Sequence, residues 1–199
     1  MRMDMSPGIA SIREYFASHV QVVERAVDEL AGKIDGCSRL LVAALDDGKK
    51  VLVMGNGGSA ADAQHLAAEL VGRFLAERKA LPAIALTTDS SILTAVGNDY
   101  GFDQVFKRQV EALAVAGDVV IGISTSGNSA NVLAALQTAR SIGCTTVALL
   151  GRDGGKIAPV VDVHLTVPAM QTPHIQEVHA MIIHILCHQV EQRLVGESG

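Results

Sequence analysis

Two short segments rich in glycine and serine contain the residue types that bind an anion without a basic side chain. The first is GNGGSAAD at 55–62, and the second is STSGNSAN at 124–131. Glycine lets backbone N–H groups approach a ligand closely, and side-chain hydroxyls add further donors. The second segment contains no Lys or Arg, and its hydroxyls belong to Ser124, Thr125, Ser126 and Ser129. The two segments predict a phosphate held by hydroxyls and helix dipoles; the alternative is a pair of ordinary turns with Ser or Asn helix caps.

The first segment also matches a relaxed dinucleotide-binding fingerprint, GxGxxA, through Gly55, Gly57 and Ala60. That fingerprint requires an acidic residue about 20 positions further on, at the end of the second strand. Here the second candidate strand runs on to Asp89, well beyond that distance. A dinucleotide would also leave the second serine-rich segment without a role. Phosphate binding is therefore favoured over nicotinamide or flavin binding.

A second group of residues has the types that hold a metal ion or move a proton. His65 and Glu69 are spaced i and i+4, so on a helix they share one face, about 6 Å apart along the axis. Imidazole, carboxylate and amide groups are acceptable to Zn²⁺, although an amide is an unusual ligand and the pattern is not HExxH. For each histidine alone, a partly solvated helix face is the simpler interpretation. The C-terminal stretch adds Gln176, Glu177, His179, His184 and His188.

The spacing of Gln176 and His184 limits how they act together. Eight residues separate them, which is about 12 Å along an ideal helix. They can share one ion only by leaning toward each other, through irregularity at the helix start, or by coming from different subunits.

Five short apolar runs are the candidate strands that would position these groups. Their near-continuous hydrophobicity is typical of strands covered on both faces. Helix-period segments lie between them at about 59–74, 102–116 and 129–142, with a short turn or helix at 90–97. This alternation predicts a parallel sheet with right-handed crossovers, and both serine-rich segments then lie at the carboxyl ends of strands, where ligands bind. The strands are expected at Lys50–Met54, Ala83–Leu86, Asp118–Ser124, Thr145–Leu150 and Asp162–Val167.

Long helices are expected on either side of this core. Ile9–Ile34 carries one apolar stripe at a spacing of three and four, Cys37–Leu45 continues after Gly36, and a C-terminal helix runs from about His174 to Leu194. A stripe outside the core needs cover, and another copy of the chain is the expected partner. The predicted fold is a three-layer α/β domain over 1–199, a doubly wound, flavodoxin-like sheet of five parallel strands. Its N-terminal helical extension, 1–48, is expected to serve oligomerisation.

Composition excludes several classes of protein. The chain has 199 residues and a net charge of −5, too acidic for a dedicated phosphate-backbone binder, and 3% aromatic residues leave little to stack on nucleic-acid bases. No apolar run approaches the roughly 18 residues of a membrane span, and Met1–Asp4 has no signal-like apolar stretch. Three cysteines far apart indicate neither a disulfide framework nor a CxxC site. We therefore expect a cytoplasmic protein that binds neither nucleic acid nor membrane.

Several longer runs of the sequence resemble bacterial phosphoheptose isomerases, a family within the sugar isomerase (SIS) domain superfamily. The resemblance covers about residues 10 to 195. The serine-rich loop is shared by many SIS proteins and indicates a sugar phosphate in general. The joint presence of GNGGSAADAQH, Glu69 and IQEVHxxxIH is much more specific. The matching runs are GNGGSAADAQHLAAEL, the pair Asn98–Asp99 before Tyr100, GISTSGNSANVL, GRDGGK and IQEVHAMIIH.

This resemblance implies an aldose–ketose isomerase that forms homotetramers and holds one Zn²⁺ per subunit. The implied reaction converts sedoheptulose 7-phosphate to D-glycero-D-manno-heptose 7-phosphate through a cis-enediol. It would be the first step of ADP- or GDP-heptose biosynthesis for lipopolysaccharide or related glycans. Glu69 would be the general base, His184 the general acid, and Arg73 matches a common family arginine. The implied zinc ligands are His65, Glu69, Gln176 and His184. The implied substrate contacts are Asn56, Gly57, Gly58, Glu69, Asn98, Asp99, Ser124, Thr125, Ser126, Ser129 and Gln176.

One alternative belongs to the same superfamily. A regulator of replication initiation, which binds the initiator protein, has nearly the same loops and also forms tetramers. It resembles an isomerase that has lost its catalytic carboxylate and final histidine. Because Glu69 and His184 are both present here, the sequence favours catalysis over a non-catalytic sugar-phosphate-binding role.

Overall fold

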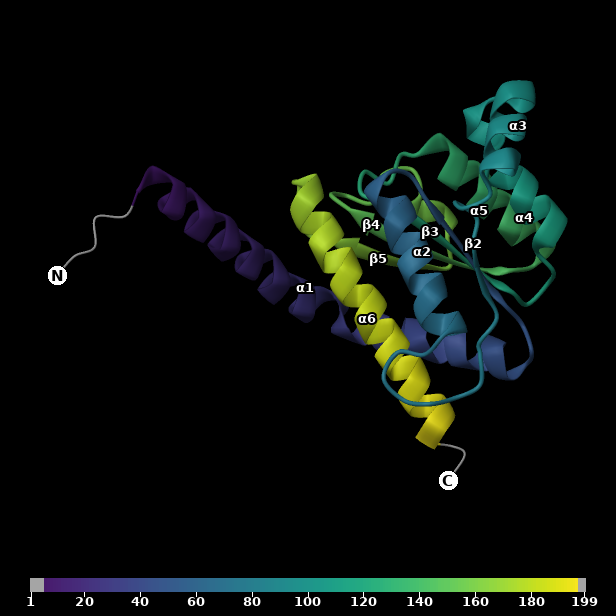
Figure 1. Cartoon of the computed structure of the whole chain (residues 1–199), viewed down its shortest axis with the longest axis horizontal. Coiled ribbons are helices and arrows are strands. Elements are labelled where there is room, and N and C mark those ends of the chain that lie inside the picture. The colour runs from purple at the N-terminus through teal and green to yellow at the C-terminus, as the bar shows by residue number, and fades with distance from the viewer. Residues whose placement is uncertain (1–5, 197–199) are drawn as a thin grey trace.

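Five parallel strands form one sheet in the order β2-β1-β3-β4-β5, as seen in the computed structural model, which describes residues 6–196 (Figure 1). The chain reverses direction across the sheet between β1 and β3, which pair with Val51 opposite Val119. In open α/β sheets such a reversal opens a crevice at the carboxyl ends of the strands. The five predicted strands are confirmed, as β1 Val51–Gly55, β2 Ala83–Ala85, β3 Val119–Ser124, β4 Thr145–Gly151 and β5 Val163–Val167.

Helices cover both faces of the sheet, which confirms the predicted three-layer architecture. One face packs against α1, α2 and α6, through strand residues such as Val53 and Ile121. The alternate strand residues, such as Leu52 and Val120, face α4 and α5. This double burial explains why the strands read as continuous apolar runs. The helices are α1 Pro7–Asp46, α2 Gly58–Val71, α3 Ser90–Tyr100, α4 Lys107–Leu113, α5 Ala130–Ile142 and α6 Thr172–Gly196, with 3₁₀ turns at Phe102–Gln104 and Ala158–Val160.

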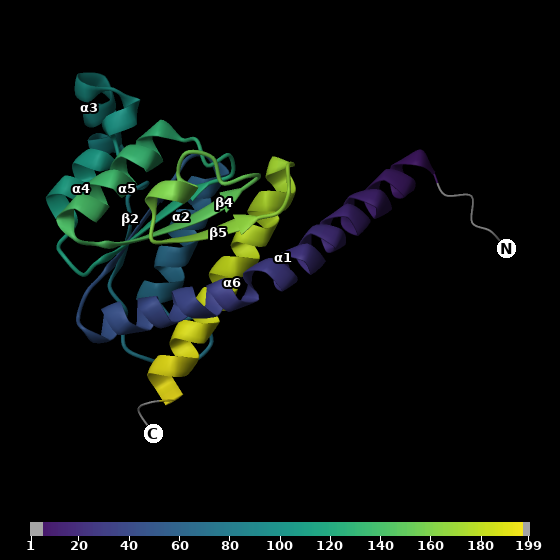
Figure 2. The ribbon, with the colours of Figure 1, turned by 180° about the vertical axis from the view of Figure 1, so that it is seen from behind.

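The N-terminal extension is one continuous helix of 40 residues, in which the two predicted helical stretches are joined through Gly36. A glycine inside a helix costs roughly 1 kcal/mol relative to alanine, which burial of the neighbouring Ile34, Cys37 and Leu41 offsets. At 1.5 Å per residue α1 is about 60 Å long, and its first half projects beyond the body (Figures 1 and 2). The ends of the predicted domain, 1–5 and 197–199, lie outside the described residues.

Two further helix boundaries differ from the sequence prediction. The single helix expected at 102–116 is a 3₁₀ turn followed by the short α4, and the element expected at 90–97 extends to Tyr100 as α3. Gly101, at φ 93°, lies in the left-handed region where α3 ends, so the chain turns sharply before continuing. Within the described part of the chain, no helix combines the length and apolar character needed to cross a bilayer.

Candidate active site

The loop after β1 brings backbone rather than a side chain to the sheet edge. Gly57 has φ 57°, a left-handed conformation, and α2 begins at the next residue without a side-chain cap. A Cβ atom added at Gly58 would lie 2.5 Å from Nε2 of Gln176, so α6 approaches the start of α2 closely. The backbone conformation therefore favours glycine at position 57, whereas a Cβ at position 58 would displace only the end of the Gln176 side chain. The loop leaves the first turn of α2 open to a ligand.

The serine-rich loop after β3 is held in shape by its own hydroxyls and by the 151–156 segment. Ser124 Oγ and Ser129 Oγ are 2.9 Å apart, so Ser129 bonds Ser124 instead of capping α5. Gly127 has φ 65°, and a Cβ there would lie 2.1 Å from the carbonyl oxygen of Gly154. Thr125 and Ser126 are partly exposed beside it. An uncapped helix N-terminus with hydroxyls around it is suited to bind an anion.

A reciprocal pair of amides joins the two loops. Asn56 Nδ2 donates to Asn131 Oδ1 at 2.9 Å, and Asn131 Nδ2 donates to Asn56 Oδ1 at 2.8 Å. Asn131 is buried and its Oδ1 also accepts from the backbone N–H of Val132. The sequence prediction missed Asn131, although its place in the serine-rich segment could have suggested it. The two loops that are predicted to bind an anion are therefore held together by hydrogen bonds.

His65, Glu69 and His184 come together on the neighbouring helices α2 and α6. His65 Nε2 lies 3.2 Å from Glu69 Oε1 and 3.2 Å from His184 Nε2. One nitrogen or oxygen from each of the three side chains falls within a group spanning at most 4.8 Å. The carboxylate and the imidazole from separate helices are thus close enough to act on one ligand. Glu69 is partly buried, and His184 is exposed at the surface.

The same three groups have the chemistry and spacing of a zinc site. Zinc binds histidine nitrogen and carboxylate oxygen at about 2.0–2.2 Å, so two ligands of one tetrahedral ion lie about 3.3 Å apart. The observed separations of 3.2 Å from His65 to each partner match that value. Two imidazoles and one carboxylate also leave a coordination position open for a substrate oxygen.

Gln176 lies apart from this group within one chain. Its amide is against Gly58, seven residues before His65 and therefore about 10 Å away along α2. Helix α6 is regular throughout, which removes irregularity at its start as a way to bring Gln176 to His184, and the Gln176 amide lies against Gly58 instead of leaning toward His184. A second subunit remains as the route by which this amide could reach the group.

The remaining predicted residues lie elsewhere. Asn98 and Asp99 are in the last turn of α3, where Asn98 Nδ2 donates to Asp99 Oδ1 at 2.8 Å. Helix α3 packs on the opposite sheet face from α2, through its partly buried Leu93 and Val96. The exposed Arg73 contacts Glu77 at 3.6 Å along its own segment. Their roles as substrate contacts stay predictions.

A segment between α2 and β2 is held against α6 beside the group of His65, Glu69 and His184, and the sequence prediction missed it. Buried Glu191 of α6 accepts hydrogen bonds from the backbone N–H groups of Leu75, at 2.8 Å, and Ala76. Arg78 donates to the carbonyl oxygens of Glu69 and Leu70, satisfying the end of α2. The segment places the Phe74 ring 5.6 Å from that of His184. Phe74 therefore forms an aromatic wall beside the proposed acid.

Asp62 is a further carboxyl on α2 that the sequence prediction passed over. Burial raises its pKa, and the nearby His65 opposes that shift. Its Oδ2 is buried without a hydrogen-bond partner among the described residues. This carboxyl with a raised pKa lies one turn before His65, at the edge of the site.

Comparison with known proteins gives a family and close relatives. A family model described as SIS domain matches residues 14–151. The phosphoheptose isomerase of Geotalea daltonii is 62% identical over 189 residues, which are 95% of this chain and 98% of that protein. The phosphoheptose isomerase of Geobacter sulfurreducens is 66% identical over 174 residues, 87% of this chain and 92% of that protein.

Solved structures agree with these relatives. A phosphoheptose isomerase from Neisseria gonorrhoeae superposes with a TM-score of 0.87 at 46% identity, covering 92% of this chain and 98% of that one. A phosphoheptose isomerase from Francisella tularensis gives a TM-score of 0.91 at 40% identity, covering 94% of this chain and 100% of that one. The likeness extends over the sheet and the helices that carry the candidate site.

Proposed function

The chain belongs to the phosphoheptose isomerases of the SIS-domain superfamily, and we propose that it converts sedoheptulose 7-phosphate to D-glycero-D-manno-heptose 7-phosphate. The enzyme is an aldose–ketose isomerase, so a proton must move between carbon atoms C1 and C2 of the sugar. The observation that carries the proposal is the grouping of the Glu69 carboxylate and the His184 imidazole within 4.8 Å, from two different helices.

The phosphate end of the sugar is assigned to the serine-rich loop. Ser124, Thr125, Ser126 and Ser129 supply hydroxyls, and the uncapped start of α5 supplies N–H groups with partial positive charge. The amide pair between Asn56 and Asn131 joins this anchor to the loop that opens α2. Anchoring the remote phosphate orients the carbonyl end over the catalytic helices, which is how binding energy contributes to catalysis.

The proton transfers use the carboxylate and the imidazole in turn. Glu69 removes a proton from C1 of the ketose while His184 donates a proton to the carbonyl oxygen on C2, which gives the cis-enediol. Glu69 then returns a proton to C2 while His184 takes the proton from the oxygen on C1, which leaves the aldehyde. Each group ends the cycle in its starting protonation state.

Zinc is the proposed cofactor, at one ion per subunit. His65, Glu69 and His184 of one chain would hold it, with Gln176 contributed by a second subunit. When bound, the ion acts as a Lewis acid that stabilises negative charge on the sugar oxygens. The separations of 3.2 Å from His65 to Glu69 and to His184, which match tetrahedral spacing, support this assignment.

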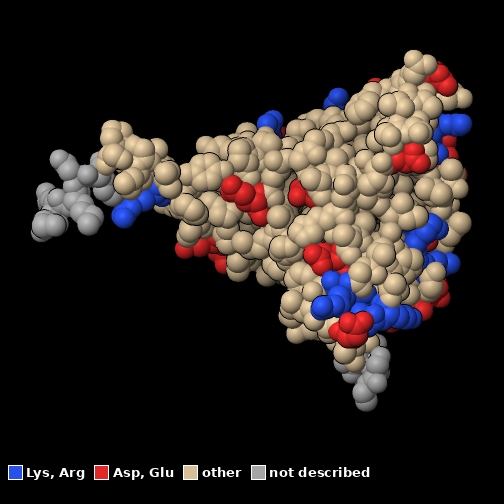
Figure 3. Space-filling view, in the orientation of Figure 1, with Lys and Arg blue, Asp and Glu red and all other residues tan. Residues whose placement is uncertain are grey.

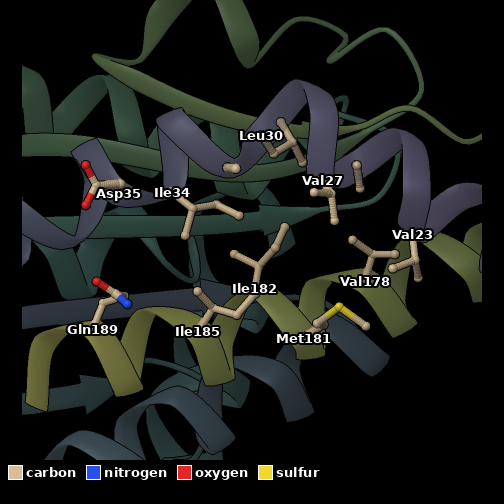
Figure 4. Close-up of a pocket in the computed structure, with 12 residues that line it drawn as sticks. Val23, Val27, Leu30, Ile34, Asp35, Val178, Met181, Ile182, Ile185 and Gln189 are labelled. Atoms are coloured by element: carbon tan, nitrogen blue, oxygen red, sulfur yellow. The ribbon is translucent and has the colours of Figure 1, made fainter. Parts of the chain in front are cut away.

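A homotetramer is the proposed assembly of this single SIS domain, with helix α1 in the contacts between subunits. The first half of α1 exposes apolar side chains, including Ile12, Phe16 and Val20. A groove of about 360 Å³ between α1 and α6 is lined almost wholly by apolar groups such as Val27 and Met181 (Figure 4). Most of the surface of the projecting half of α1 in this view belongs to residues other than Lys, Arg, Asp and Glu (Figure 3). Exposed apolar surface of this kind favours a protein partner.

The proposed setting is the cytoplasm, at the start of heptose activation for lipopolysaccharide or related glycans. A non-catalytic, initiator-binding regulator is not favoured, because the relatives that cover the whole chain are named isomerases and because both Glu69 and His184 are in place. That alternative requires sugar-phosphate binding without turnover, so a turnover assay distinguishes an isomerase from a regulator.

The test is direct turnover in deuterated water. The purified protein is incubated with sedoheptulose 7-phosphate, and NMR follows the aldose 7-phosphate and deuterium incorporation at C2. Glu69→Gln is expected to lower kcat at least about 100-fold while keeping its circular dichroism spectrum, because the base is removed without a change of shape. Glu111→Gln, an exposed glutamate on α4, is the matched control and keeps full activity. Wild-type-like turnover in Glu69→Gln removes Glu69 from the mechanism, and no turnover in the native protein overturns the proposal.

A further inference from the structure

A second cluster of metal-ligand side chains lies where α1 crosses the start of α6, outside the catalytic group. We propose that His19, His174 and Glu177 form a further divalent-metal site that takes Zn²⁺ and joins α1 to α6. One ligand atom from each of the three lies within 4.8 Å of the others. Nδ1 of His19 is 2.8 Å, and Nδ1 of His174 is 2.9 Å, from the same oxygen, Oε2 of Glu177.

The hydrogen-bond network around His174 leaves Nδ1 free to bind a cation in one of the two neutral forms of the ring. Ser18 Oγ lies 2.8 Å from the carbonyl oxygen of Tyr15 and 2.9 Å from His174 Nε2. When the Ser18 hydroxyl donates to that carbonyl, it accepts from the Nε2–H group of His174. The ring then presents the lone pair of Nδ1, 2.9 Å from the carboxylate oxygen of Glu177, to a shared cation.

His19 supplies a second, independent indication. Its Nδ1 is buried and has no hydrogen-bond partner among the described residues, although it lies 2.8 Å from Glu177 Oε2. A buried nitrogen without a hydrogen bond needs an explanation such as an ion or a water molecule. A metal ion between His19, His174 and Glu177 accepts the lone pairs of both rings and neutralises the carboxylate.

The surroundings are those of a supported metal site. Ser18 fixes the ring of His174 through its second nitrogen, and Tyr15 donates to the other carboxylate oxygen of Glu177 at 2.6 Å. Such outer hydrogen bonds orient metal ligands. His174 is 3% exposed, whereas the side chains of His19 and Glu177 are 22% and 36% exposed, so an ion can enter from solvent. Two imidazoles and one carboxylate are donors that zinc prefers.

This site is distinct from the catalytic group and independent of the proposed function. Glu177 and His184 lie on the same regular helix seven residues apart, which places them about 10 Å from each other along α6. No ligand is shared between the two groups. Loss of isomerase activity therefore neither supports nor contradicts metal binding at His19.

Calorimetric titration with ZnCl₂ tests the proposal on the full-length chain, stripped of metal with a chelator. A His65→Gln, His184→Gln double variant removes the catalytic group first. We expect this variant to bind one equivalent of zinc, and adding either His19→Gln or Glu177→Gln to weaken that binding more than about 100-fold, beyond the loss expected from an outer-shell change. Adding His164→Gln, a histidine of β5 bonded to Thr166, is the matched control and leaves binding unchanged.

A melting experiment provides a second readout that does not depend on the added substitutions. Saturating zinc should raise the Tm of the double variant, because a ligand that binds the native state stabilises it. Zinc binding that survives both His19→Gln and Glu177→Gln overturns the proposal. The proposal is also overturned if the double variant is folded but neither binds zinc nor gains in Tm. His174 then donates a hydrogen bond to Glu177 and the cluster holds no metal.

Discussion

His179, on the buried face of α6, links the position of that helix to the protonation of one side chain. Its Nε2–H donates to the carbonyl oxygen of Leu150 at 2.9 Å, at the carboxyl end of β4. Burial lowers the pKa of His179 to about 4, and the bond to Leu150 opposes that shift only in part. The neutral ring is therefore the form that holds α6, and with it Gln176 and His184, against the sheet.

This burial predicts a loss of stability in mild acid. Between pH 6.5 and about 4 the unfolded chain binds a proton at His179 and the folded protein does not, so the free energy of unfolding falls as the pH falls. The loss should reach about 3 kcal/mol in order of magnitude. Urea unfolding at several pH values measures it. His179→Gln, which keeps a donor but cannot titrate, should flatten the profile over this range; an unchanged slope in that variant contradicts the assignment.

His184, the proposed acid, depends for its surroundings on a segment that carries none of the proposed catalytic residues. The segment between α2 and β2 is held by Glu191 and Arg78, and it sets Phe74 beside His184. Hydrogen bonds to a charged group contribute about 1.5–3 kcal/mol each to stability, so the Glu191 carboxylate makes the main contribution to holding this segment against α6.

Replacing Glu191 with Gln should release the segment between α2 and β2 from α6 while the rest of the protein stays folded. We expect about 2 kcal/mol of lost stability and a lower kcat, because the Phe74 ring no longer fixes His184. Trypsin, which cleaves after Arg73, Arg78 and Lys79, should cut the variant much faster at these residues. Glu77→Gln, an exposed glutamate in the same segment, is the control and should resist trypsin like the native protein, since exposed ion pairs contribute little. Equal cleavage of the two variants would rule out the clamp.

The periodicity of the sequence was sufficient to predict the sheet and the helix face that carries His65 and Glu69. Strands buried on both faces and an i, i+4 pair on one helix are local patterns, so residues near in the chain determine them. The amide pair of Asn56 and Asn131 joins residues 75 apart, and the contacts of Glu191 with the segment at 75–76 span more than 100 residues. Such contacts depend on how helices pack, which no short window of sequence encodes. The joining of the two predicted stretches into one α1 depends on packing too, because burial against the sheet and α6 outweighs the low helix propensity of Gly36.

At the scale of the whole molecule, α1 predicts that the protein is not stable as a monomer. The double variant Ile12→Ser, Phe16→Ser places two hydroxyls on the exposed apolar stripe and should shift light scattering from tetramer to smaller species. Activity should fall with it if Gln176 reaches the catalytic group from a second subunit. Arg13→Ser with Glu24→Ser changes exposed polar positions of the same helix without altering net charge, and should stay tetrameric. A monomeric native protein would remove α1 from any role in assembly.

The anion-binding loop has a kinetic consequence for the entire molecule. It offers helix dipoles and hydroxyls but no Lys or Arg between residues 124 and 131, and dipoles of this kind act only within about the first helical turn. At an ionic strength of about 0.01 M the Debye length is about 30 Å, so an approaching sugar phosphate is repelled over that range by a protein with a net charge of −5. Approach of the substrate is therefore slowed by repulsion, and attraction begins only close to the loop. Added salt should hasten capture of the substrate, the reverse of what an enzyme that steers phosphates with a basic funnel would do.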